Sequence, residues 1–424
     1  MRLKNLNIKK INLNDVDKNY SGQDILMKLG ELYQFESGIY GYGNIWTKME
    51  RMVENIIIEE LDKVGCIQVE FPKLQPKKIW DQSSRWDMYT KEGDIMFTLD
   101  NNLGEYGLAP TAEECATIFG ANRLPSYKNL PATYYQIGEK FRKEIRTRGY
   151  LFRPRTFVMM DAYSFDKTEE DMKKNYEKMH KAYLNIFKRL GIKIMPTVSD
   201  NGVIGGSVAE EFQASTPLGE DKILYDEEKD LGINKEVLDF DNKEEYLKQL
   251  NIEDVSTLKE YTTVELGNNF QLGTKYSESM KLYFIDENGE QKPYYMGCYG
   301  IGLGRIIACL IENNVIWKED KLKGFALPYH MAPYKVHIIY NEKNKEEAEN
   351  LYEKLQENNI PSIIDDREKL SIGNRINDVY VLGTPKMIIL GNQFDSKNYI
   401  IENTKDNTNE TIEIDKIIDY FKSL

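Results

Sequence analysis

Two apolar, aromatic segments joined by a strongly basic loop are the feature that most restricts how this chain can fold. Residues 133–142 (TYYQIGEKFR) and 155–165 (RTFVMMDAYSF) have the composition of β-strands, and residues 144–154 (EIRTRGYLFRP) connect them. Aromatic and β-branched residues favour strands, and a polar connection between two such runs is typical of a hairpin. We therefore expect an antiparallel pair of strands with a long charged loop between its arms.

The basic residues of this region stand out because the chain of 424 residues has a net charge of −13. An acidic protein can contact RNA only through local basic patches. Period-two alternation places Arg142 and Glu144 on one face of a strand, and Phe157 lies on the returning strand. An arginine for phosphate, a carboxylate for an amino group and a ring for stacking predict a nucleotide site. The alternative is an exposed charged hairpin without a ligand. The basic residues are Lys140, Arg142, Lys143, Arg146, Arg148, Arg153 and Arg155.

A second candidate site is the glycine-rich run at residues 300–305 (GIGLGR). Alternating glycines on one strand face let a planar ligand approach the backbone, and Arg305 at the start of the next helix can reach a phosphate. The spacing matches neither a dinucleotide-binding fingerprint nor a phosphate-binding P-loop. By itself the run is also compatible with a tight turn or a bulge.

The rest of the chain predicts a mixed architecture. Apolar residues at steps of three and four predict helices over residues 49–64 and 167–190, and the alternation of strands and helices after residue 332 predicts a separate α/β domain. Residues 219–262 are acidic, rich in lysine and weakly periodic, and we interpret them as a short surface insertion. The sheet before residue 218 and from about 260 to 325 is expected to be mostly antiparallel.

Composition also excludes several classes of protein. The four cysteines and three histidines are scattered without a metal-ligand spacing, so no protein metal site and no disulfide framework are predicted. No run of 18 apolar residues and no signal-like start occurs, so we expect a cytoplasmic protein without a membrane partner.

These features occur in an order that resembles the three motifs of class II aminoacyl-tRNA synthetases, and more specifically the bacterial-type prolyl-tRNA synthetases. The resemblance covers residues 20–424. It implies an α+β catalytic domain with an antiparallel sheet and a C-terminal α/β anticodon-binding domain. The matching blocks are LAPTAEE (108–114), PSYKNLP (125–131), FRKEIRTRGYLFRPRTFVMMDAYSF (141–165), GGSVAEEF (205–212), ELGNNFQLGTKYSE (265–278), MGCYGIGLGR (296–305) and IDDREKLSIGNRI…LGTPKMIILG (364–391).

The resemblance implies a role for each matching residue at the nucleotide. Arg142 is expected to bridge the α-phosphate of ATP and the carboxylate of the amino acid, and Glu144 to hold the adenine amino group. Arg153 and Arg305 are expected to hold the β- and γ-phosphates, and Phe157 to stack on adenine. Arg142 and Arg305 are thus the expected catalytic residues, and Mg²⁺ is expected with ATP.

The same resemblance implies the contacts with the other substrates. Thr111 and Glu113 are expected to hold the secondary amine of the amino acid, which would be proline, and Cys298 to line its pocket. Arg146 and Arg148 are expected to contact the acceptor end of tRNA, and the tRNA is expected to be the proline-specific one. Relatives of this kind form homodimers, so a second copy of the chain is an expected partner.

The implied domain boundaries are residues 1–218 and 260–328 for the catalytic core, 219–259 for a short insertion where many relatives carry an editing domain, and 332–424 for the anticodon-binding domain.

The chain departs from the family pattern near the amino-acid pocket. It has Ala209-Glu210 where the family has Ser-His, Thr156 where it has Glu, and Met160 where it has Lys. The first change is expected to alter the charge of the loop beside the pocket. A ligase for a different amino acid or for an acceptor other than tRNA is therefore an alternative, and a catalytically inactive tRNA-binding protein is a third hypothesis.

Overall fold

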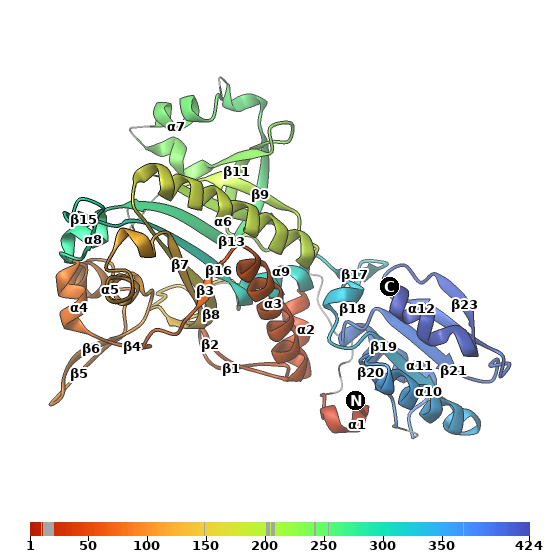
Figure 1. Ribbon diagram of the computed structural model, residues 1–424. Helices are drawn as coiled ribbons and strands as arrows, with labels where there is room; N and C mark the ends of the chain where they lie inside the picture. Colours follow the sequence, from red (N-terminus) through yellow and green to blue (C-terminus); the bar gives the residue numbers. More distant parts are fainter. Residues whose placement is uncertain are drawn as a thin grey trace. The chain divides into compact units, whose positions relative to one another are not determined.

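The computed structural model describes residues 1–9, 11, 21–147, 149–200, 204, 208–240, 243–252, 254–367 and 369–424 (Figure 1). The chain forms two compact units. One consists of Met1–Glu36, Tyr40–Met52 and Ile307–Leu424, and the other of Ser37–Ile39 and Val53–Ile306. No helix in the described ranges is long and apolar enough to cross a membrane.

A nine-stranded sheet is the centre of the second unit, with the strand order β10-β9-β12-β11-β13-β16-β8-β7-β3. Its middle consists of β13 (Lys259–Gly273), β16 (Tyr295–Gly302), β8 (Thr156–Asp166) and β7 (Ala132–Phe141), and each neighbouring pair of these is antiparallel. This confirms the expected antiparallel core. The predicted hairpin is the β7–β8 pair, whose register places Lys140 opposite Phe157.

One long helix covers a face of this sheet. Helix α6 (Glu169–Leu190) packs on β8, β13 and β16, as Figure 1 shows. It begins where the Thr168 hydroxyl accepts a hydrogen bond from the Asp171 amide and ends at Gly191 in the left-handed conformation. Three acidic residues in its first turn and two basic residues in its last turn suit the helix dipole.

The segment interpreted as a surface insertion contributes to the main sheet, which corrects that interpretation. β11 (Asp221–Asp226) pairs with β13, and β12 (Leu231–Asn234) pairs in parallel with β9 (Ile194–Val198). β10 (Val208–Ser215) pairs with both β9 and β13, so that β10, β9, β12, β11 and β13 form a closed ring of strands. The sequence did not predict β11 and β12, because strands of only four to six residues give a weak periodic pattern.

Shorter elements complete the second unit. Among the described residues, this unit also holds the three-stranded sheet β4-β6-β5, the hairpin of β14 and β15, and helices α4, α5, α7 and α8. β3, the edge of the large sheet, is only two residues long, and just beyond it the Val69 amide still donates to the Tyr135 carbonyl of β7 at 2.8 Å. The bounds are β3 (Ile67–Gln68), β4 (Leu74–Pro76), α4 (Lys77–Gln82), β5 (Thr98–Asn101), β6 (Gly104–Leu108), α5 (Glu113–Arg123), α7 (Lys243–Gln249), α8 (Lys275–Ser279), β14 (Tyr283–Ile285) and β15 (Gln291–Pro293).

The first unit contains a five-stranded sheet of the order β20-β19-β21-β22-β23. β19 pairs in parallel with both β20 and β21, which confirms the strand–helix alternation expected after residue 332. The unit also holds the N-terminal helices and two hairpins. The bounds are α1 (Leu3–Leu6), α2 (Gly22–Leu29), β1 (Leu32–Glu36), β2 (Ile39–Tyr42), β17 (Val315–Lys318), β18 (Lys321–Phe325), β19 (Val336–Tyr340), α10 (Lys345–Glu357), β20 (Ser362–Ile364), α11 (Ile372–Val381), β21 (Lys386–Leu390), β22 (Asn398–Asn403), β23 (Asn409–Glu413) and α12 (Ile417–Ser423).

Helices α3 (Asn44–Lys63) and α9 (Leu303–Glu312) each belong partly to both units. From Val53 on, α3 buries one apolar face, on which Val53, Ile57 and Leu61 are completely buried. Gly65, in the left-handed conformation at φ 75°, follows its end as the sequence indicated.

Replacing Ile57 by alanine should therefore lower the free energy of unfolding by about 2–5 kcal/mol, because it opens a cavity in a packed interior. The neighbouring Ile58→Ala is the matched control, since Ile58 is only half-buried. Urea denaturation of both variants measures the effect. Equal losses for the two would contradict the packing described for α3.

Candidate active site

A buried carboxylate lies in the wall of the candidate amino-acid pocket. Glu113 begins helix α5 and is fully buried, and the Thr111 hydroxyl lies 2.8 Å from each of its carboxylate oxygens. The Cys298 thiol on β16 donates to Glu113 Oε1 at 3.4 Å. The structure thus brings together all three residues that the sequence assigned to the amino acid.

Arg85 is the buried cation that faces the Glu113 carboxylate. Its guanidinium lies 3.1 Å from Glu113 and 2.9 Å from Glu114, and donates to the Tyr89 hydroxyl at 2.5 Å. Burial alone would raise the pKa of both carboxyls. For Glu113, the charge of Arg85 and the hydrogen bond from Thr111 outweigh burial and lower the pKa. For Glu114, burial and the like charge of Glu113 outweigh Arg85 and raise the pKa. Arg85 thus contacts both buried carboxyls, and the sequence did not predict this role because an isolated arginine belongs to no motif.

Arg142 connects the amino-acid pocket with the candidate adenine site. Its Nε donates to the carbonyl of Pro110, directly before Thr111, at 3.3 Å, and its guanidinium carbon lies 5.2 Å from the centroid of the Phe157 ring. The expectation that Arg142 and Glu144 share a strand face is wrong, since β7 ends at Phe141. Both residues lie instead in the loop that follows, where the Arg142 amide still donates to the Arg155 carbonyl at 2.9 Å.

The two candidate phosphate-binding arginines face carboxylates. Arg305, at the start of α9, donates to the Phe152 carbonyl at 2.9 Å, the Glu265 carbonyl at 2.8 Å and the Glu265 carboxylate at 2.9 Å. Arg153 Nε lies 3.7 Å from Glu144 and 3.8 Å from Glu220. Because the Arg153 side chain is 49% exposed, these last contacts contribute little to stability and leave the guanidinium accessible to an anion.

Further carboxylates on β10 and β11 lie beside Glu265, and sequence reasoning missed them. The Gln213 amide nitrogen donates to Glu211 at 2.7 Å and to Asp221 at 3.1 Å. Burial, with Glu265 and Asp221 as like charges, raises the pKa of Glu211 to about 8. Among the described residues the Gln213 Oε1 atom is buried without a hydrogen-bond partner. The only feature of the sequence that could have predicted these carboxylates is the pattern of polar residues at alternate positions of β10.

Two residues of β8 complete the wall behind the pocket. The Tyr163 hydroxyl donates to Asp161 at 2.9 Å and accepts from the Ala112 amide at 3.0 Å, between Thr111 and Glu113. Asp161 is paired in turn with the buried Lys140 at 2.6 Å. Strand alternation could have placed Asp161 and Tyr163 on one face, but nothing in the sequence showed which face lines the site.

The unusual Ala209-Glu210 pair is arranged differently from the expectation. Ala209 is buried in the same apolar cluster as Cys298 and Phe270. The side chain of Glu210 contacts α6, where it accepts a hydrogen bond from His180 Nδ1 at 2.8 Å. The predicted change in charge beside the amino-acid pocket is therefore wrong, because alternation along β10 turns position 210 towards the helix.

Of the two arginines expected at the tRNA acceptor end, Arg146 is exposed in the loop between β7 and β8. Arg148 lies outside the described residues. The neighbouring Ile145 is also 81% exposed, so the tip of this loop contributes nothing to the core.

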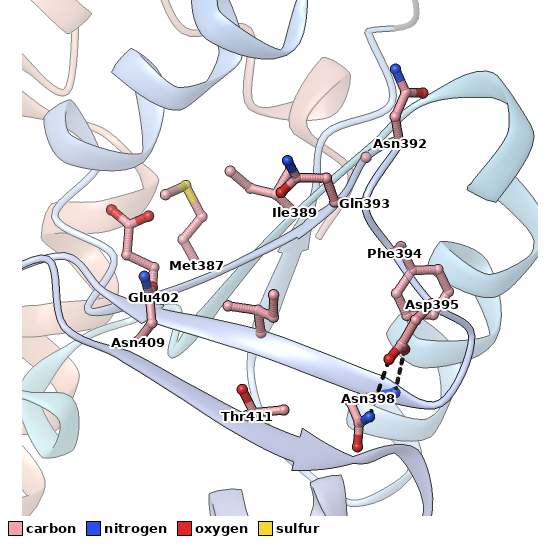
Figure 2. A pocket seen from close by; sticks show the side chains of 12 residues that line it. Met387, Ile389, Asn392, Gln393, Phe394, Asp395, Asn398, Glu402, Asn409 and Thr411 are labelled. Carbon is pink, nitrogen blue, oxygen red and sulfur yellow. Dashed lines mark hydrogen bonds between the residues drawn. The ribbon is translucent and has the colours of Figure 1, made fainter.

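A separate pocket of about 420 Å³ lies in the five-stranded sheet of the other unit (Figure 2). Residues of β21, β22 and β23 and of the loop after β21 line it. Figure 2 shows the side chains of Asn392, Gln393 and Phe394 at one end of it and those of Glu402 and Asn409 at the other. Amide groups and an aromatic ring around an open sheet face suit the edges and faces of unpaired bases.

Comparisons with known proteins agree with this geometry. Residues 89–314 match the model of the class II tRNA synthetase core domain (G, H, P, S and T), and residues 335–424 match that of the anticodon-binding domain. The proline--tRNA ligase of Rickettsia bellii is 35% identical over 404 residues, which cover 92% of each chain, and that of Rickettsia akari is 34% identical over 411 residues, covering 94% of each.

The chain belongs to the proline--tRNA ligase family. Its fold is similar to that of prolyl-tRNA synthetase from Cryptosporidium parvum. The complex of that protein with halofuginone and AMPPNP superposes with a TM-score of 0.74 at 16% identity, over 96% of this chain and 80% of the other. The complex with L-proline and AMP gives 0.75 at 15% identity, over 98% and 78%.

The contact between His180 and Glu210 in this member of the proline--tRNA ligase family predicts a pH-dependent stability. The hydrogen bond to Glu210 raises the pKa of His180 against the opposing effect of burial. The stabilisation is therefore complete below the unfolded-state pKa of about 6.5 and is lost as pH rises through the folded-state value. His180→Gln should lower the free energy of unfolding by about 1 kcal/mol at pH 6 and by much less at pH 9.

Urea denaturation of the wild type and His180→Gln at both pH values checks this expectation. Glu210→Gln should abolish the same pH dependence. A difference that is equal at the two pH values, or larger at pH 9, would contradict the ion pair.

Proposed function

We propose that this chain activates proline with ATP to prolyl-adenylate and transfers the prolyl group to the 3′ end of a proline-specific tRNA. The observation that carries the proposal is Arg142, whose guanidinium reaches both Phe157 and the carbonyl before Thr111. That position joins a base-stacking ring to a pocket whose buried carboxylate, Glu113, suits the cationic secondary amine of proline. The family of the chain and its anticodon-binding domain support tRNA as the acceptor.

In the proposed reaction the proline carboxylate attacks the α-phosphorus of ATP and pyrophosphate leaves. A carboxylate is already a nucleophile, so no general base is required. Arg142 orients the carboxylate and neutralises charge on the α-phosphoryl oxygens, while Arg153 and Arg305 hold the β- and γ-phosphates. Arg153 lies near Glu144 and Glu220 and Arg305 is paired with Glu265, and ATP would replace part of those contacts. Glu144 would then accept from the adenine amino group.

Mg²⁺ is expected with ATP. The described residues contain no group of three or more His, Cys, Asp or Glu side chains arranged as a protein-only metal site. Mg²⁺ on nucleotide phosphates needs only one or two protein carboxylates. Glu265, which is paired with Arg305 at 2.9 Å, and Asp221, which accepts from Gln213 at 3.1 Å, are the carboxylates that would hold the ion. The bound ion would neutralise charge on the phosphate oxygens.

Three further expectations belong to the same proposal. The pocket of Figure 2 would receive anticodon bases. The catalytic core would comprise residues 1–218 and 260–328, and the anticodon-binding domain residues 332–424, in a cytoplasmic enzyme. Within residues 219–259, β11 and β12 pair with strands of the main sheet and do not form a domain of their own. This supports an enzyme without an editing domain at that position.

The proposed enzyme is a homodimer. β3 forms the edge of the large sheet, and Ile67 on it and Leu74 on β4 are 50% and 46% exposed. Exposed apolar residues on an edge strand favour association with another chain. Sedimentation at micromolar concentration should give the mass of two chains, and a monomeric mass would contradict this part of the proposal.

Replacing Arg142 by alanine should lower the rate of proline-dependent ATP–pyrophosphate exchange by at least about 10²–10³-fold, because it removes a charged donor that acts on both reactants. Arg123→Ala is the control, since Arg123 is exposed at the end of α5. Exchange near the wild-type rate in Arg142→Ala, with the fold retained, would argue decisively against the site.

Replacing Arg146 by alanine should weaken tRNA aminoacylation several-fold and leave pyrophosphate exchange unchanged. Its charge is exposed at the tip of the loop, where it can contact RNA phosphates. The loss should shrink as salt is raised. Equal damage to both reactions would place Arg146 at the nucleotide instead.

A further inference from the structure

The hairpin of β17 and β18 ends in a tight turn that presents two lysines. Lys318 and Lys321 are its last cross-strand pair, and Glu319 and Asp320 between them have φ angles of 50° and 59°. Two central residues in the left-handed region define a type I′ hairpin turn, a conformation that residues other than glycine and asparagine adopt at a cost. The turn therefore fixes both lysines at the end of a rigid two-stranded element.

Trp317 on this hairpin is the exposed tryptophan of the chain. Its side chain is 48% exposed, whereas Trp46, Trp80 and Trp86 are at most 7% exposed. A large flat ring that remains in water is unusual for a residue that packs so well in interiors. Aromatic rings in such positions stack on unpaired nucleic-acid bases.

The turn next to Trp317 carries two lysines and two carboxylates, Lys318, Glu319, Asp320 and Lys321, so its net charge is zero. Neither Lys318 nor Lys321 forms an ion pair with any residue that the structure describes, and Lys405 reaches the base of the hairpin, 3.4 Å from Asn314 Oδ1. Lys323 lies with its Nζ 3.6 Å from the centroid of the Tyr380 ring. Because Lys318 and Lys321 hold no carboxylate among the described residues, both ammonium groups can contact RNA phosphates.

The hairpin is continuous with the candidate RNA-binding domain, because all of these residues belong to one compact unit. Lys323 donates to Asn407 Oδ1 at 3.2 Å, and the Tyr380 hydroxyl donates to Asn407 and Glu402, at 3.0 and 3.1 Å. Glu402 lines the pocket shown in Figure 2. Tyr380 thus links the open sheet face to the hairpin through direct contacts.

We propose that the β17–β18 hairpin is a second RNA-contact surface, on which Trp317 stacks an unpaired base of the bound tRNA while Lys318 and Lys321 contact adjoining phosphates. The inference rests on the proposed function, because the RNA is the tRNA that the adjacent domain binds. A second copy of this chain is the other conceivable occupant, and the experiment separates the two.

The test measures the binding of a fluorescent proline-specific tRNA transcript to the full-length protein as salt is varied. Trp317→Leu should weaken binding about tenfold, as expected for one lost stacking contact, and Trp317→Phe should retain most of the affinity. The double variant Lys318→Ala/Lys321→Ala should bind more weakly and with a smaller dependence of log Kd on log salt. Lys343→Ala/Lys354→Ala, which removes two exposed lysines elsewhere in the same unit, is the charge-matched control and should bind as the wild type does.

Proline-dependent pyrophosphate exchange, which needs no tRNA, should be unchanged in all of these variants, and thermal melting checks that each is folded. Wild-type affinity in folded Trp317→Leu, or equal losses in the two lysine pairs, would overturn the proposal. A change in sedimentation mass with unchanged tRNA affinity would assign the hairpin to contacts between copies of the chain instead. If the wild type itself neither exchanges pyrophosphate with proline nor binds the tRNA, the proposed function fails and this inference fails with it.

Discussion

The charge balance around Arg85 is the constraint on which the catalytic unit depends. A fully buried arginine faces two buried glutamates, and an unpaired charge at this depth would cost several kcal/mol. Arg85 and the Thr111 hydroxyl hold the pKa of Glu113 below its ordinary value against the effect of burial, which favours the ionised carboxylate. Thr111 and Cys298 donate hydrogen bonds to the Glu113 carboxylate and thereby fix its orientation. A buried carboxylate held in one orientation by Thr111 and Cys298 is a suitable partner for a cationic imino acid.

The charged side chains of the proposed phosphate site, unlike those around Arg85, are partly exposed to solvent. Arg153 lies near Glu144 and Glu220, which belong to loops, and Arg305 is paired with Glu265 on β13. Such contacts are weak in water and can be exchanged for those of a triphosphate. The closed ring of strands includes β13, which carries Glu265 beside Arg305, and residues 221–234 contribute two strands to that ring.

The sequence was most informative where a local pattern and the tertiary structure agree. The β7–β8 pair, the ends of α6, the start of α9 at the glycine run and the alternation of the C-terminal domain were all predicted, because periodicity and capping are local properties. Arg85, Glu265 and Gln213 could not be predicted, because their partners come from distant strands and helices. Glu210 was misinterpreted for the same reason. Its effect depends on which face of β10 it occupies, and the sequence of β10 alone cannot show that His180 lies opposite.

The identity of the amino acid tests the account most directly. ATP–pyrophosphate exchange would be measured with the wild-type chain and each of the twenty amino acids in turn, at saturating ATP and Mg²⁺. The account predicts rapid exchange with proline and much slower exchange with alanine, which fits the pocket but lacks the ring that fills it. Exchange that is fastest with another amino acid, or absent with all of them, would contradict the assignment of the Thr111–Glu113–Cys298 pocket to proline.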